Sequence, residues 1–306
     1  MGEAVAAVDP WAFQAHPEVW ALVAGLAGLW WYAMRRIGPT AVRDDEPVVT
    51  RGQAGWFAAA LLTLWFASDW PVHDLAEERL YAAHMFQHLL LSFIVPAMAL
   101  LGTPTWLARL LVGSGRGYRV VRALTRLIPA TLIFNSVVLL THAPFAVTAS
   151  VENPLLHYGI HVLVVGSGLI MWMGVCGPLP ELRFRMPVQM AHLFLQSLIP
   201  VVPAGWLTFA EGVVYKVYDT PYRMWGLTAV EDQQLAGVIM KVAGSTFLWA
   251  VIIVLFARWV ERSQGDERAR GIAPDRRAPE ADVLTWAEVE RQLATAPPAP
   301  QEPEHT

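Results

Sequence analysis

Seven long apolar stretches limit what this chain can fold into. Each is long enough to cross a hydrocarbon layer about 30 Å thick as a helix that rises about 1.5 Å per residue. Of the 306 residues, 55% are hydrophobic and only 16% are charged, which is too apolar for an ordinary soluble domain. We predict an all-α polytopic membrane protein with seven transmembrane helices, at residues 18–37, 53–70, 80–102, 126–145, 155–176, 187–210 and 233–260.

The basic residues are divided unevenly between alternate connections. Arginines gather after the first, third, fifth and seventh stretches, as Arg35, Arg36, Arg43, Arg51, Arg109, Arg116, Arg119, Arg122, Arg126, Arg183, Arg185, Arg258, Arg262, Arg268 and Arg270. The other connections hold only Arg79, Lys216 and Arg223. Because basic loops stay in the cytoplasm, we expect the N-terminus outside the cell and the C-terminus in the cytoplasm.

Composition divides the chain into three parts. We expect a short outer segment at 1–17, a membrane domain at 18–262 and a mostly disordered cytoplasmic tail at 263–306, where the residues turn polar and prolines accumulate. A short helix is expected within this tail at 283–294. No cleavable signal peptide is expected, because residues 1–17 lack a basic start followed by an apolar core.

Some function classes do not fit the sequence. The single cysteine, Cys176, excludes an intramolecular disulfide and a CxxC motif for redox or metal chemistry. The HExxH motif of zinc proteases is absent. The net charge of −4 gives no reason to expect a nucleic acid partner. The partner that the composition does imply is the lipid bilayer.

Five of the nine histidines fall near the outer ends of predicted spans: His84, His88, His142, His157 and His161. His84 and His88 are four residues apart, as are His157 and His161, so each pair shares a helical face. A single histidine at a helix end is usually an interfacial residue. Since imidazole is the commonest side-chain metal ligand and polar groups are costly at membrane depth, we predict that the five bind a metal ion or cofactor.

Five neighbouring residues are candidates for supporting this site: His73, Met85, Gln87, Asn153 and Asp69. His73 is a sixth imidazole, and the thioether of Met85 suits Cu(I), although methionine in an apolar helix usually packs. Gln87 is placed to orient a histidine ring. Asn153 also fits a simple helix cap, and Asp69 an ordinary interfacial residue. His192, near the cytoplasmic end of the sixth span, is expected to be structural.

A second group of polar residues lies deeper in the predicted spans. It consists of Asn135, Gln196 and Lys241, and no acidic residue lies at that depth. An unpaired ammonium is expensive inside a membrane, so Lys241 should find hydrogen-bond partners. We expect a mid-membrane polar layer that makes the helix packing specific, with a proton or ion role as the alternative.

Five motifs together resemble the polytopic CtaG family of cytochrome c oxidase assembly factors, especially its actinobacterial branch. They are ERLYAAHMFQH at 78–88, THAP at 141–144, NPLLH at 153–157 followed by His161, GPLPE at 177–181 and DQQLAGVIMK at 232–241. The resemblance covers about residues 16–262. It implies a seven-helix protein of the bacterial plasma membrane that is needed to assemble an active haem-copper oxidase.

The resemblance also implies a protein partner and a metal cargo. The expected role is that of an assembly factor rather than an enzyme, which receives copper at the outer histidines, from an external donor, and delivers it to an oxidase subunit in the same membrane. Zinc would accept the same imidazoles. A haem-binding membrane cytochrome and a small-solute or ion transporter are the alternatives from other classes.

Overall fold

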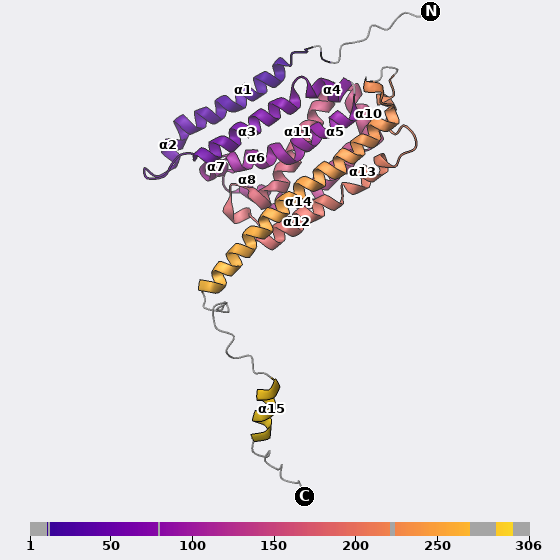
Figure 1. Ribbon diagram of the computed structural model, residues 1–306. Helices are drawn as coiled ribbons and strands as arrows, with labels where there is room; N and C mark the ends of the chain where they lie inside the picture. The colour runs from indigo at the N-terminus through magenta and orange to yellow at the C-terminus, as the bar shows by residue number, and fades with distance from the viewer. Residues whose placement is uncertain (1–10, 12, 79, 221–223, 270–285, 296–306) are drawn as a thin grey trace, which may run out of the picture. The chain divides into compact units, whose positions relative to one another are not determined.

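The computed structural model of the protein describes residues 11, 13–78, 80–220, 224–269 and 286–295, and most of them are helical. No strand occurs among those residues, so the prediction of an all-α fold is confirmed. The chain divides into two compact units, Met1–Trp259 and Val260–Thr306. Figure 1 shows the helices of the first unit lying alongside one another, with α4 and α10 at one end and α2 and α7 at the other.

The α-helices have the following bounds: α1 Pro17–Tyr32, α2 Gly38–Ala41, α3 Arg51–Ser68, α4 Val72–Glu78, α5 Tyr81–Leu89, α6 Val95–Gly102, α7 Thr105–Val112, α8 Arg116–Leu124, α9 Leu127–Thr141, α10 Pro144–Glu152, α11 Pro154–Cys176, α12 Met186–Leu198, α13 Val201–Thr208, α14 Ala229–Ala269 and α15 Trp286–Thr295. Two π-helical turns, η1 Ala33–Ile37 and η2 Leu90–Ile94, continue α1 and α5. Three 3₁₀ turns are η3 Pro180–Leu182, η4 Lys216–Tyr218 and η5 Met224–Gly226.

Among the described residues, four helical segments are long and apolar enough to cross a membrane. They are Tyr81–Gly102, Pro154–Cys176, Met186–Thr208 and Ala229–Asp266, and they contain most of the third, fifth, sixth and seventh predicted spans. A fifth candidate joins α8 to α9, which meet at a bend of 72°. The described part of the chain thus has four or five candidate spans where seven are predicted.

The other predicted spans form helices with shorter apolar runs. Helix α1 has 16 residues before its backbone widens into η1. Helix α3 has 18 residues and opens with Arg51 and Gln53. The block at 126–145 is divided, because α9 ends at Thr141 and a new helix starts at Pro144. Proline is favoured in the first turn of a helix, so Pro144 starts α10 rather than extending α9.

Side-chain caps and prolines determine where several helices begin. Thr50 and Gln53 form a reciprocal capping box at the start of α3. Asn153 accepts the backbone N–H of Leu156 at 3.2 Å and Pro154 occupies the first turn of α11. Pro200 lies between α12 and α13 and interrupts the sixth predicted span.

The segment α5–η2–α6 lies in the interior of the first unit and α14 lies at its surface. The apolar window of Tyr81–Gly102 is 61% buried, whereas that of Ala229–Asp266 is 22% buried. Exposed aliphatic side chains include Leu132 on α9, Val162 on α11 and Ile253 on α14. Apolar surface on this scale requires a cover other than water, and lipid provides it.

The described part of the C-terminal unit consists of the end of α14 and the short helix α15. Helix α14 continues to Ala269, past residue 263 where the predicted tail begins. Helix α15, Trp286–Thr295, coincides with most of the helix predicted at 283–294. The rest of the predicted tail, at 270–285 and 296–306, lies outside the described residues.

Candidate metal centre

Three helices carry the histidines to one end of the first unit, where α4 and α10 lie (Figure 1). Helix α5 holds His84 and His88 on adjacent turns, and α11 holds His157 and His161 in the same relation. His142 is the C-terminal cap of α9. Since α9 runs toward this end while α5 and α11 start there, all five rings reach one level.

His84, His88 and His161 form the tightest group, which we call the imidazole triad. One nitrogen from each ring lies within 4.8 Å of the others. The ring centroids of His88 and His161 are 5.3 Å apart, and those of His84 and His88 are 4.3 Å apart. Three buried atoms in this group, Nδ1 of His84 and Nε2 of His88 and His161, have no hydrogen-bond partner. Three imidazoles with free nitrogens suit a metal ion.

His157 lies beside the triad. Its ring centroid is 4.3 Å from that of His161 and 5.6 Å from that of His84. Its Nδ1 lies 3.0 Å from the hydroxyl oxygen of Ser150, which orients the ring. His157 therefore borders the triad and has a defined orientation of its own.

Two further histidines, closer to the start of the chain, extend the triad and His157 into a row of neighbouring rings. The ring of His73 lies 6.3 Å from that of His157, and the ring of His16 lies 4.8 Å from that of His73. His16 also bonds the carboxylate of Asp74 at 2.6 Å. The prediction omits His16, because this residue precedes the first apolar block and only the packing of the N-terminal segment against α4 brings it close.

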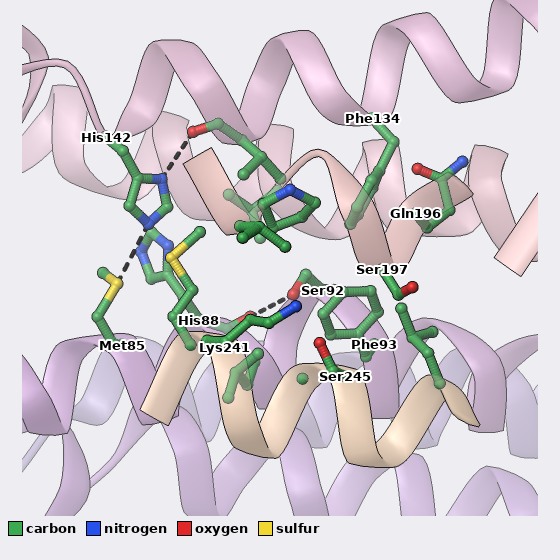
Figure 2. Close-up of a pocket in the computed structure, with 18 of the residues that line it drawn as sticks. Met85, His88, Ser92, Phe93, Phe134, His142, Gln196, Ser197, Lys241 and Ser245 are labelled. Atoms are coloured by element: carbon green, nitrogen blue, oxygen red, sulfur yellow. Dashed lines mark hydrogen bonds between the residues drawn. The ribbon is translucent and has the colours of Figure 1, made fainter. Parts of the chain in front are cut away.

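His142 is a neighbour of His88, with their ring centroids 6.4 Å apart. Its Nδ1 donates to the carbonyl oxygen of Val138 at 2.6 Å, and its Nε2 lies 3.2 Å from Sδ of Met85. Both side chains are buried. Figure 2 shows this contact at one end of a cavity that His88 also lines.

Comparison with protein families gives one match that covers most of the chain. The model for the cytochrome c oxidase caa3 assembly factor, CtaG, matches residues 11–262. The chain belongs to this CtaG family. No curated protein and no solved structure matches it. The family match contains every histidine of the row from His16 to His161.

Asp232 holds the histidine-bearing helix of this CtaG family member in place, and sequence reasoning missed that role. Its carboxylate accepts the backbone N–H groups of Tyr81 and Ala82, at 2.7 Å and 3.0 Å. The N-cap residue of α5 is Leu80, whose side chain accepts no hydrogen bond. Asp232, from the first turn of α14, therefore performs the capping task across the bundle. Its position before Gln233 in the fifth motif is the only sequence signal.

Three predicted supporting residues have structural partners. Gln87 is fully buried and donates to the carbonyl oxygen of Ala67 at 2.8 Å, with Nδ1 of His73 at 3.2 Å. Asp69 accepts the indole N–H of Trp20 at 2.7 Å and that of Trp65 at 2.5 Å. Asn153 caps α11. Thus Gln87 orients His73, and Asp69 ties α1 to α3.

Of the three deeper polar residues of the family member, Asn135 and Gln196 are paired, and Lys241 is not part of this pair. Asn135 donates to the side-chain oxygen of Gln196 at 2.6 Å. Lys241 lines a cavity of about 50 Å³ together with Gln196 and makes no hydrogen bond to Asn135 or Gln196 within the described chain. Figure 2 shows its ammonium directed into that cavity near Ser92. Neither member of this pair is therefore a hydrogen-bond partner of Lys241.

His192 lies outside the row. It is fully buried and donates from Nε2 to the carbonyl oxygen of Met171 at 3.2 Å, with the hydroxyl of Thr131 at 3.1 Å from Nδ1. Since both ring nitrogens have partners, this histidine has no free lone pair for a metal ion.

Proposed function

We propose that this chain is an assembly factor, not an enzyme, that binds copper transiently at the imidazole triad and delivers it to a haem-copper oxidase subunit in the same plasma membrane. The observation that carries the proposal is the set of unpartnered ring nitrogens in His84, His88 and His161. Buried polar atoms normally have hydrogen-bond partners, so three unpartnered nitrogens in one cluster of histidines need another explanation. A metal ion supplies it.

The family supports copper as the cargo. Cytochrome c oxidase assembly is the role of the family to which this chain belongs. A haem-copper oxidase contains haem and copper, and imidazoles bind copper in either oxidation state. The cavity beside His84 and His88 has a volume of about 10 Å³, which is room for about one water molecule. An ion fits such a space and a haem macrocycle does not.

The row of imidazoles offers a route for the ion. His16, His73 and His157 precede the triad in space, with successive ring centroids 4.8, 6.3 and 4.3 Å apart up to His161. We expect copper to enter from an external donor at the His16 end. Under the positive-inside rule this end faces outward, because the arginine-rich connections lie at the other end.

Copper retention by the purified protein tests the proposal. We expect the double variant His84→Ala, His88→Ala to lose copper affinity by more than about 100-fold, since one remaining imidazole cannot complete the coordination. His161→Ala should be nearly as severe, and His157→Ala milder. His192→Ala is the matched control for a buried histidine and should retain copper.

Cells that depend on this factor provide the functional readout. With the double variant, oxidase subunits and haem should accumulate while copper content and respiratory activity fall, and added copper should partly restore both. Normal oxidase copper with the double variant at wild-type expression would contradict the proposal. Zinc in place of copper in protein purified from its native membrane would indicate a different cargo.

A further inference from the structure

A second set of metal donors lies next to the triad, at the contact between His142 and Met85. The carbonyl oxygen of Val138 can only accept a hydrogen bond, so Nδ1 of His142 carries a proton. In the neutral ring, Nε2 then presents a lone pair to Sδ of Met85 at 3.2 Å. Two buried acceptors face each other there, and neither has a proton to share.

Protonation of His142 would relieve this contact only at a cost. It would place an imidazolium in a cavity for which no carboxylate is found among its described lining residues. A buried charge without a partner is expensive. A metal ion is better suited, because metal bonds are about 2.0 Å to imidazole nitrogen and about 2.3 Å to sulfur, so one ion can contact both atoms at their present separation.

We propose that His142 and Met85 form a second, deeper subsite that is selective for copper(I). A thioether is a soft ligand that favours Cu(I) over zinc or Cu(II). A further thioether, that of Met240, lines the same cavity. This inference rests on the proposed copper-binding function of the triad and extends it to a second position and a defined oxidation state.

His88 connects the two positions. Its ring centroid is 5.3 Å from that of His161, in the triad, and 6.4 Å from that of His142. His88 also lines the cavity with Met85. Copper(I) can therefore pass from the triad to the deeper subsite by exchanging one imidazole for His142 and another for Met85 while His88 stays bound. The ion keeps its charge, so the step needs no oxidant, reductant or proton.

Lys241 lines the cavity that the deeper ion would border. Its ammonium repels a cation at His142 and Met85, and the described lining holds no acidic residue to compensate. This repulsion weakens binding of the ion, which helps a site that must release its ion to a partner. Lys241→Gln should accordingly tighten binding of the second ion, by on the order of threefold or more.

Two measurements on the full-length protein in detergent test this proposal. The first is an anaerobic titration with Cu(I) against a chromogenic Cu(I) chelator, and the second is X-ray absorption spectroscopy of the loaded protein. We expect wild type to bind two ions, with copper–sulfur scattering appearing with the second. Met85→Leu should weaken the second ion by more than about tenfold, and Met85→Leu, Met240→Leu should remove the sulfur scattering. Met171→Leu, a substitution of another fully buried methionine, is the control.

The outcomes separate this inference from the proposed function. Nitrogen-only scattering in wild type with two ions bound would overturn the deeper subsite without any variant, so a folding defect cannot obscure the result. Retention of both ions by Met85→Leu, Met240→Leu would do the same. If His161→Ala keeps sulfur scattering and loses one ion, both sites stand. If the double variant His84→Ala, His88→Ala and the single variant His161→Ala both bind copper as wild type does, the proposal of copper binding at the triad is wrong. The sulfur signal still reports on Met85 in that case.

Discussion

The carboxylate of Asp232 accepts the backbone N–H of Tyr81 at 2.7 Å and so joins the first turn of α14 to the first turn of α5. The two residues are far apart in the chain, and both are buried. A negative charge at a helix N-terminus is stabilising, because it meets unpaired N–H groups and the positive end of the helix dipole. His84 lies one turn further along the same helix, so this contact helps to fix the position of the first histidine of the triad.

Removal of this carboxylate should destabilise the protein. We expect Asp232→Ala to lower the free energy of unfolding by about 2–3 kcal/mol, since it leaves two buried N–H groups without an acceptor. Asp232→Asn retains an acceptor oxygen and should cost less. Thermal unfolding in detergent measures both, with the exposed Glu152→Ala as control. Equal melting temperatures for wild type and Asp232→Ala would contradict this role.

Gly168 permits the close approach of α11 to the turn that follows His88. A Cβ at Gly168 would clash with the carbonyl oxygen of Ser92. His161 is two turns before Gly168 on the same face, and His88 is one turn before Ser92, so separation of the helices here would separate those two imidazoles. We expect Gly168→Ala to lower stability by about 1–3 kcal/mol and to weaken copper binding.

Gly166→Ala is the matched control for that substitution. A Cβ at Gly166 would meet nothing within 4 Å, and alanine is the better helix former by about 1 kcal/mol. This variant should therefore be neutral or more stable than wild type. Thermal unfolding and copper titration of both variants compare the same chemical change at two positions of one helix, and similar behaviour would contradict the role of the close approach.

The contact between His16 and Asp74 predicts a dependence of stability on pH. Burial lowers the pKa of His16, but the hydrogen bond and charge of Asp74, with Glu18, outweigh it and raise the pKa above its usual 6.5. A raised pKa means that the stabilisation is complete below about pH 6.5 and is lost as the pH rises through the folded-state pKa. The His73 ring, 4.8 Å away, is the other titratable group facing His16.

Thermal unfolding at pH 5.5 and pH 8.5 measures this effect. Wild type should exceed His16→Gln by about 0.5–1 kcal/mol at the lower pH, and the difference should shrink at the higher pH. Asp74→Asn should remove most of that pH dependence. A difference between wild type and His16→Gln that grows from pH 5.5 to pH 8.5 would show that the neutral imidazole is the stabilising form.

Reporter fusions test the orientation on which the route for copper depends. Translocation of several arginines in a short loop is disfavoured. Fusions at Thr40 and Gly265 should therefore report the cytoplasm, and those at Leu75 and Ser150 the outside. An external signal at Thr40 would place the histidine end of the bundle in the cytoplasm and exclude an external copper donor.

The pattern of apolar residues and local spacing was enough to predict an all-α fold and to place the histidines of the candidate site in pairs. Helical periodicity alone puts His84 on one face with His88 and His157 on one face with His161, because residues four apart differ by about 40° on a helix. Proline and asparagine likewise predict the start of α11. These are local properties, which depend on residues close together in the chain.

Relations between helices depend on packing that no local pattern encodes. The predicted span at 126–145 ends early, because α9 stops at Thr141 and α10 starts at Pro144, and α8 meets α9 at a bend of 72°. Asp232 at the start of α5, His16 beside His73, and Met85 facing His142 each join segments distant in sequence. Such contacts are set by which side chains fill the space between helices at close-packed density, so they follow from the folded bundle as a whole.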